Sequence, residues 1–287
     1  MMRAMASPTP SELTSAANPR VKAARALRDR RERDRTGLTL VDGARELRRA
    51  LAAGIAIDEA FVCEPLLAGP DARAALDGLL AAQVPLHRVS ERVLASLAFG
   101  DRAEGLVAVA RARSTSLDAL SLPPDPLIVV IEGVEKPGNV GAVLRSADGA
   151  GADAVIAASP RTDLFNPNAI RASAGTVWSV ALAAAPTPTV LDWLRGLGIR
   201  IVAARVDAAR RYTDADLSGP LALVLGAEVD GLTNPWAAPD VEAVNVPMFG
   251  VADSLNVSVT AAVLLYEARR QRGVPERGHR DPGAIDR

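Results

Sequence analysis

The chain has 287 residues, enough for two domains with cores of their own or for one large domain. Hydrophobic residues make up 49%, charged residues 23% and aromatic residues only 3%, which indicates a globular protein and argues against an aromatic platform for single-stranded nucleic acid. The net charge is −1, and one cysteine with two histidines excludes a disulfide framework and argues against a metal site.

The positive charge is concentrated near the start of the chain. Residues 1–50 hold twelve Arg or Lys against six Asp or Glu. This basic segment on a nearly neutral protein favours a local contact with a polyanion, although a solvated helix of mixed charge has the same pattern. No signal peptide or membrane-length apolar run appears, so we expect a cytoplasmic protein that does not enter a membrane.

The first half of the chain alternates strand and helix patterns. Residues 1–13 are rich in Ser, Pro and Thr, and we expect them to be mobile. The pattern between residues 14 and 113 predicts a small α/β/α domain. Its expected strands are 38–41, 60–63, 86–89 and 106–111, and its expected helices are 44–53, 72–82 and 91–97.

A linker and a larger α/β domain follow. Residues 114–126 have three prolines among the last four and are expected to join the domains. From Leu127 a continuous apolar run predicts a strand buried on both faces, as in a parallel sheet. The domain is expected to span 127–273, with a mobile tail at 274–287. Its other expected strands are 154–157, 179–183, 199–203, 221–225 and 241–246.

Two strand ends carry candidate chemistry. After the strand at 127–131 comes a glycine-rich turn into a helix, with Asn139 expected to cap that helix and Arg145 nearly two turns on. The turn is not a P-loop, because no Gly-Lys-Ser/Thr closes it. The strand at 221–225 runs into Gly226 and Glu228. Since ligands of open α/β sheets bind at the carboxyl ends of the strands, both turns are candidate sites.

A third stretch, Val244 to Arg272, closes the domain. Pro247 ends a strand pattern, and Asp253 or Ser254 is expected to cap a helix that ends at the arginines before Gly273. The helix is apolar on so many sides that we expect it to be buried on nearly all of them. Polar side chains nevertheless gather at its start, namely those of Ser254, Asn256 and Ser258.

These three stretches together resemble the ordered motifs of the SpoU/TrmH class of SPOUT RNA ribose methyltransferases. The matching residues are Asn139-x-Gly141-x-x-x-Arg145, Gly226-x-Glu228, and Val246-Pro-Met with Ser254-Leu-Asn256. Residues 14–113 are similar to the L30e-like substrate-binding domain of many members. In length and domain plan the chain looks most like the antibiotic-resistance 23S rRNA methyltransferases of actinomycetes, a group that includes the avilamycin-resistance uridine 2′-O-methyltransferases.

The resemblance implies a C-terminal trefoil knot that binds S-adenosylmethionine, a homodimer, no metal, and ribose 2′-O-methylation of 23S rRNA, in that group as a means of antibiotic resistance. The catalytic residues it implies are Asn139, Arg145, Glu228, Ser254 and Asn256. The implied cofactor contacts are Ala204, Gly226, Val246, Met248 and Leu255. The implied RNA-phosphate contacts are Arg20, Lys22, Arg28, Arg30 and Arg31.

Three alternatives stay open at this point. A non-catalytic RNA-binding protein on the same fold is disfavoured by the intact motif residues. A dinucleotide-dependent oxidoreductase would need a glycine fingerprint at its first strand, and none fits. A tRNA ribose methyltransferase has the same motifs but usually lacks the separate N-terminal domain, so rRNA is favoured.

Overall fold

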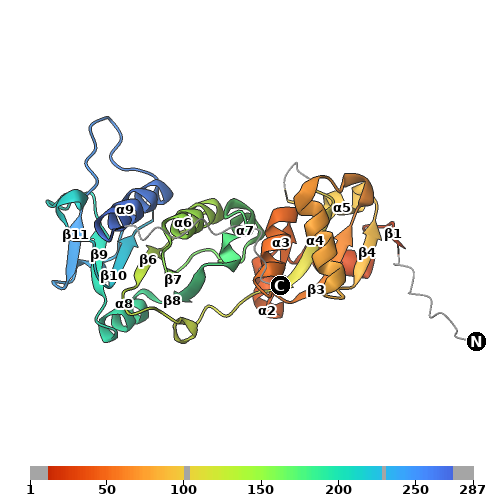
Figure 1. The fold of residues 1–287 in the computed structure, drawn as a ribbon, viewed down its shortest axis with the longest axis horizontal. Helices are drawn as coiled ribbons and strands as arrows, with labels where there is room; N and C mark the ends of the chain where they lie inside the picture. The colour runs from red at the N-terminus through yellow and green to blue at the C-terminus, as the bar shows by residue number, and fades with distance from the viewer. Residues whose placement is uncertain (1–11, 100–103, 228–230, 274–287) are drawn as a thin grey trace, which may run out of the picture.

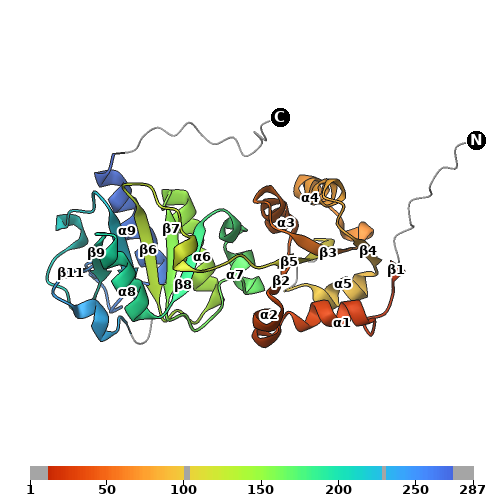
Figure 2. The ribbon, with the colours of Figure 1, turned by 90° about the horizontal axis from the view of Figure 1, so that it is seen from below.

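The computed structural model describes residues 12–99, 104–227 and 231–273. These residues fold into two α/β units, each built on its own sheet (Figures 1 and 2). The predicted α/β fold class is therefore confirmed. Residues 1–11 and 274–287, which we expect to be mobile, lie outside the described residues, as do 100–103 and 228–230.

The N-terminal unit is a mixed five-stranded sheet with helices on both faces. Its strands follow the order β1-β4-β3-β5-β2, with β5 antiparallel to both of its neighbours. The strands are β1 (Glu12–Leu13), β2 (Leu38–Asp42), β3 (Ile57–Val62), β4 (Leu86–Val89) and β5 (Leu106–Arg111). The helices are α1 (Pro19–Ala26), α2 (Arg30–Thr36), α3 (Ala44–Ala52), α4 (Gly69–Ala81) and α5 (Glu91–Leu97). Glu12 and Leu13, within the segment expected to be mobile, pair with β4.

The C-terminal unit is a parallel six-stranded sheet in the order β11-β9-β10-β6-β7-β8. Its strands are β6 (Leu127–Glu132), β7 (Ala154–Ala158), β8 (Ala181–Ala185), β9 (Arg200–Ala204), β10 (Leu221–Leu225) and β11 (Val241–Val244). Every residue of β6, β7 and β10 is buried, which explains their continuous apolar sequences.

Helices cover both faces of this sheet. They are α6 (Pro137–Ala150), α7 (Pro167–Ala172), α8 (Thr187–Gly196) and α9 (Val257–Gln271). In Figure 1, α6 and α9 lie side by side on one face and α8 lies on the other. Contrary to the expectation for α9, its outer side is open, because Val259 is 46% exposed and Tyr266 57% exposed. The helix is apolar around more of its circumference than this fold covers.

The two units are joined by buried polar contacts as well as by apolar packing. The guanidinium of Arg33, 5% exposed, lies 2.6 Å from the Asp163 carboxylate. The Thr39 hydroxyl donates to the Phe165 carbonyl oxygen at 2.7 Å, and Arg171 forms an ion pair with Asp42 at 2.6 Å. These contacts fix α7 and the segment before it against β2, so the N-terminal unit is held close to one end of the parallel sheet.

Candidate active site

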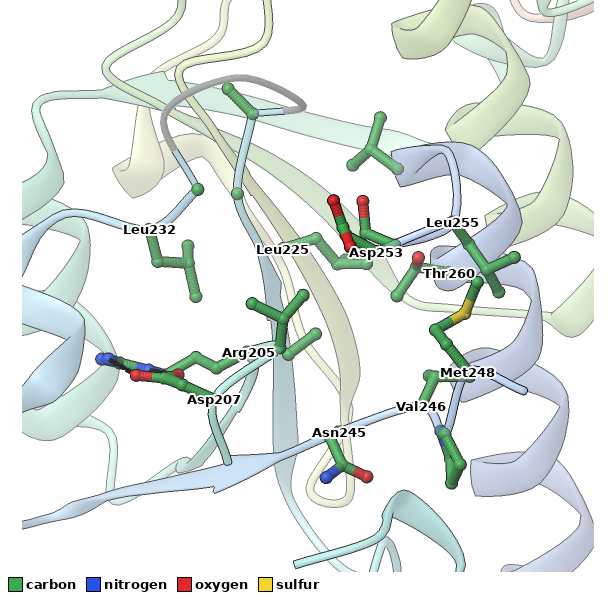
Figure 3. Close-up of a pocket in the computed structure, with 18 residues that line it drawn as sticks. Arg205, Asp207, Leu225, Leu232, Asn245, Val246, Met248, Asp253, Leu255 and Thr260 are labelled. Atoms are coloured by element: carbon green, nitrogen blue, oxygen red, sulfur yellow. Dashed lines mark hydrogen bonds and ion pairs between the residues drawn. The ribbon is translucent and has the colours of Figure 1, made fainter. Parts of the chain in front are cut away.

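A cavity of about 620 Å³ lies where β9, β10 and β11 end and α9 begins (Figure 3). Adjacent parallel strands bring the segments that follow them to one edge of the sheet, which is the usual ligand position in such folds. The cavity is lined by every residue that the resemblance implies for cofactor binding, namely Ala204, Gly226, Val246, Met248 and Leu255. Ser254 lines it as well.

Gly226 has no room for a side chain. A Cβ atom placed on it would lie 2.3 Å from the carbonyl carbon of Gly231 and 2.6 Å from the amide nitrogen of Leu232. The chain returns on itself here, because Gly231 donates its N–H to the Ala227 carbonyl oxygen. Glycine is therefore required by a close backbone approach within the wall of the cavity.

The wall of the cavity combines apolar and polar side chains, with an ion pair near one end. Leu225, Leu232 and Val246 contribute side chains to it (Figure 3). Arg205 and Asp207 face each other there and form a two-bond ion pair at 2.9 and 2.8 Å. This pairing lowers the pKa of the Asp207 carboxyl below its usual value. Apolar side chains beside fixed polar and charged groups suit a flat heterocycle joined to a polar tail.

The start of α9 differs from the prediction. Neither Asp253 nor Ser254 caps the helix. Asn256 is the N-cap, and its Oδ1 accepts from the Ser258 N–H at 2.9 Å and from the Ser258 hydroxyl at 2.6 Å. Its Nδ2 donates to Oδ1 of Asn139 at 3.2 Å. The third motif is thus joined to the first by a hydrogen bond between two candidate catalytic residues.

The start of α6 also differs from the prediction. Pro137 is the first helical residue, and Lys136, not Asn139, holds the N-cap position. Proline is favoured there because its fixed φ already suits a helix. Asn139 is the third residue of the helix, where its side chain accepts the hydrogen bond from Asn256. Arg145 is exposed farther along α6, and no carboxylate among the described residues pairs with it.

Glu228 lies outside the described residues. A second carboxylate at this edge, which the sequence did not single out, is Glu132 at the end of β6. It is 3% exposed and accepts hydrogen bonds from Thr187 and Thr233. The sequence does contain a pattern that indicates this residue, because Glu132 directly follows the continuous apolar run 127–131.

The five basic candidates on α1, α2 and the turn between them are all exposed, but three of them have structural partners. Arg20 pairs with Glu59 at 3.1 Å, and Arg28 lies 4.5 Å above the Phe99 ring. Arg30 donates to the carbonyl oxygen of Arg161 at 3.0 Å. Lys22 and Arg31 make no ion pair with any described residue, so they are the most available for phosphate.

The described residues offer neither a metal cluster nor a membrane-spanning helix. No group of three or more His, Cys, Asp or Glu is placed to hold a metal ion within 12–99, 104–227 and 231–273. In the same part of the chain, no helix has the length and apolarity to cross a membrane.

Comparison with known proteins assigns both units. Residues 126–266 match the SpoU rRNA Methylase family, and residues 18–108 match the MRM3-like substrate binding domain. The chain is 37% identical over 206 residues to the 23S rRNA (guanosine-2′-O-)-methyltransferase RlmB of Ralstonia nicotianae, covering 68% of this chain and 80% of that protein. It is 36% identical over 173 residues to the 23S rRNA (uridine(2479)-2′-O)-methyltransferase of Streptomyces viridochromogenes, covering 58% of this chain but only 60% of that enzyme.

Solved structures agree with these relatives. A crystal structure described as an RNA 2′-O ribose methyltransferase is 45% identical, with a TM-score of 0.80, and the match covers 91% of this chain and 98% of that one. The SpoU methyltransferase AviRb from Streptomyces viridochromogenes, solved with S-adenosylmethionine, is 29% identical with a TM-score of 0.78, over 88% of this chain and 98% of that one. On these matches and on the geometry of its three motifs, the chain belongs to the SpoU rRNA methylase family.

Proposed function

We propose that this protein transfers the methyl group of S-adenosylmethionine to a ribose 2′-hydroxyl of 23S rRNA. The observation that carries the proposal is the cavity at the ends of β9, β10 and β11, because all five cofactor candidates line it and Asn139 meets Asn256 nearby. The relatives named for this reaction on 23S rRNA support the choice of RNA. A trefoil knot, which the family resemblance implies for this region, remains part of the proposal.

The cavity fits S-adenosylmethionine in size and chemistry. Its apolar wall, which includes Leu225, Val246 and Leu255, can enclose an adenine ring (Figure 3). The missing side chain at Gly226 lets the backbone of Gly231 and Leu232 pack against it, and this close approach shapes the wall that would face the ligand. When bound, the cofactor supplies an electrophilic methyl group on a sulfonium.

We assign the reacting groups as follows. The ribose 2′-oxygen bonds to the methyl carbon while the carbon–sulfur bond breaks, and the hydroxyl proton passes to water. Arg145, exposed on α6, holds the neighbouring phosphate and stabilises the charge that develops on the oxygen. A guanidinium stays protonated at ordinary pH, so this role suits it better than that of a general base. Asn139 and Asn256 position the ribose, and Ser254 completes the polar side of the cavity.

The experiment that tests this assignment compares two variants of Arg145. Arg145→Ala should abolish methyl transfer while the dissociation constant for S-adenosylmethionine stays within about twofold of wild type. Arg145→Lys keeps the charge but loses the planar fork, so it should retain partial activity. Near wild-type transfer by Arg145→Ala contradicts the assignment, and so does a strong loss of cofactor binding.

RNA is proposed to run across both units. Lys22 and Arg31 lie on α1 and α2, which follow the lower edge of the molecule in Figure 2. The contact of Arg30 with Arg161 brings α2 next to the segment that follows β7, at the carboxyl edge of the parallel sheet. Phosphate contacts position an RNA without reading its sequence. Lys22→Ala with Arg31→Ala should therefore weaken binding to different RNAs alike and lower its dependence on salt.

The protein is further proposed to act as a homodimer in the cytoplasm, where rRNA is its substrate. Apolar side chains are exposed beside the cavity and along α9, including Phe249 at 95%, Val251 at 105% and Tyr266 at 57%. Covering them with a second copy removes apolar surface from water. Val259→Asp should shift the protein toward a monomer in sedimentation experiments. A wild-type protein that is monomeric at micromolar concentration contradicts the proposal.

A further inference from the structure

Glu132 is a charged side chain in a place where charge is costly. It is the last residue of β6, and only 3% of its surface is exposed. Three donors satisfy its carboxylate: the hydroxyls of Thr187 and Thr233, each at 2.6 Å, and the Thr233 N–H at 2.8 Å. A buried carboxylate is tolerated only with such partners, so these contacts determine where the attached segments lie.

Two of the three donors belong to the segment that closes the cavity. Because Ile131 pairs with Leu225 across the sheet, Glu132 stands beside Gly226. The chain leaves β10 at Gly226 and returns through Gly231 and Leu232, which both line the cavity, before it reaches Thr233. Residues 231–233 thus lie against Gly226, the residue that follows β10, and are held by Glu132 at Thr233.

The third donor belongs to a different part of the fold. Thr187 begins α8, its N–H donates to the Ser159 hydroxyl at 3.0 Å, and Ser159 follows β7. Thr233 directly follows the lining residue Leu232, whereas Thr187 and Ser159 neither line the cavity nor adjoin a residue that does. One carboxylate therefore has one partner on the cavity segment and one on the supporting scaffold, so the two connections can be tested separately.

We propose that Glu132 is a positioning residue that shapes the cofactor cavity by holding Thr233, so that Gly231 and Leu232 press against Gly226 before the cofactor arrives. Its effect reaches the cofactor only through residues 231–233. Preorganisation of this kind strengthens binding because less ordering remains to be done on association. The proposal rests on the proposed function in one respect, that S-adenosylmethionine is the ligand of the cavity.

The test measures binding of S-adenosylmethionine and of S-adenosylhomocysteine by isothermal titration calorimetry. Thr233→Val removes the hydroxyl donor at similar size and should weaken binding of both about tenfold, the worth of one hydrogen bond to a charged group. Thr187→Val removes an equivalent donor from the same carboxylate but should leave affinity within about twofold. Thr233→Ser restores the hydroxyl and should restore affinity.

Thermal unfolding of the same variants separates positioning from general stability. Thr233→Val and Thr187→Val should lower the melting temperature by similar amounts and differ only in affinity. Equal losses of affinity in both variants overturn the proposal, because Glu132 then acts through overall stability. Unchanged affinity in Thr233→Val also overturns it. A wild-type protein that binds neither ligand contradicts the proposed function itself, and the positioning role with it.

Discussion

Replacing Gly226 by alanine adds a single methyl group and should nevertheless abolish tight cofactor binding in the cavity. The added methyl carbon would lie 2.3 Å from the Gly231 carbonyl carbon and 2.4 Å from its oxygen, whereas ordinary contacts begin near 3.4 Å. The backbone at 231–232 must therefore retreat by about 1 Å. Both residues line the cavity, so its shape changes with them.

Overpacking of this kind costs about 1–3 kcal/mol of folding free energy. We expect binding of S-adenosylmethionine to weaken at least roughly 100-fold, which is about 2.7 kcal/mol of binding free energy. The reason is that the displaced backbone forms the wall that contacts the cofactor. Calorimetric titration with S-adenosylmethionine measures the affinity, and urea unfolding measures the stability.

Gly196→Ala is the matched control. Gly196 ends α8, and a Cβ atom there meets nothing within 4 Å. This variant should bind the cofactor like wild type and unfold at the same or a slightly higher urea concentration. Wild-type affinity in Gly226→Ala would refute the reasoning, since it would mean that 231–232 moves without consequence for the cavity.

Three further predictions concern stability. Burial raises the pKa of Asp42 from 3.8 to about 6 despite its contacts with Phe99 and Arg171, so folding is favoured when this carboxyl is protonated. The free energy of unfolding of the wild type, relative to that of Asp42→Asn, should rise by about 3 kcal/mol as the pH falls from 7 through 6 to below 4. Urea unfolding measures this difference, and a difference that does not change with pH contradicts the prediction. Arg269→Ala removes the donors to the carbonyl oxygens of Ala150, the last residue of α6, and of Gly151 after it; it should cost about 1–3 kcal/mol in the same assay with cofactor affinity unchanged. Gly141→Ala, whose Cβ would lie 2.5 Å from that of Ala172, should lower the melting temperature by several degrees.

The sequence predicted the parallel sheet well because its strands are buried on both faces. The apolar run at 127–131 and that at 221–225 needed no partner to be recognised. The cavity could be placed for a related reason, since ligands collect where such strands end. Helix starts were harder. Several neighbouring polar residues before α9 can each serve as a helix N-cap. The residue that does so is Asn256, which also forms a hydrogen bond with Asn139, a residue distant in the sequence.

Other features depend on contacts that no local pattern contains. The partners of Glu132 lie 55 and 101 residues along the chain, so its burial could not be read from the residues around it. The exposed side of α9 is a second case. Val259 and Tyr266 continue the apolar pattern of the helix, and only the fold shows that neither unit covers them.

Methyl transfer from labelled S-adenosylmethionine tests the central claim most directly. Protein-free 23S rRNA, intact ribosomes, 16S rRNA and bulk tRNA are each incubated with the enzyme, and the labelled nucleoside is then identified. The proposed function predicts label in a single 2′-O-methylnucleoside of 23S rRNA. Label on a base, label confined to tRNA or 16S rRNA, or no label in either free or ribosomal 23S rRNA would contradict it.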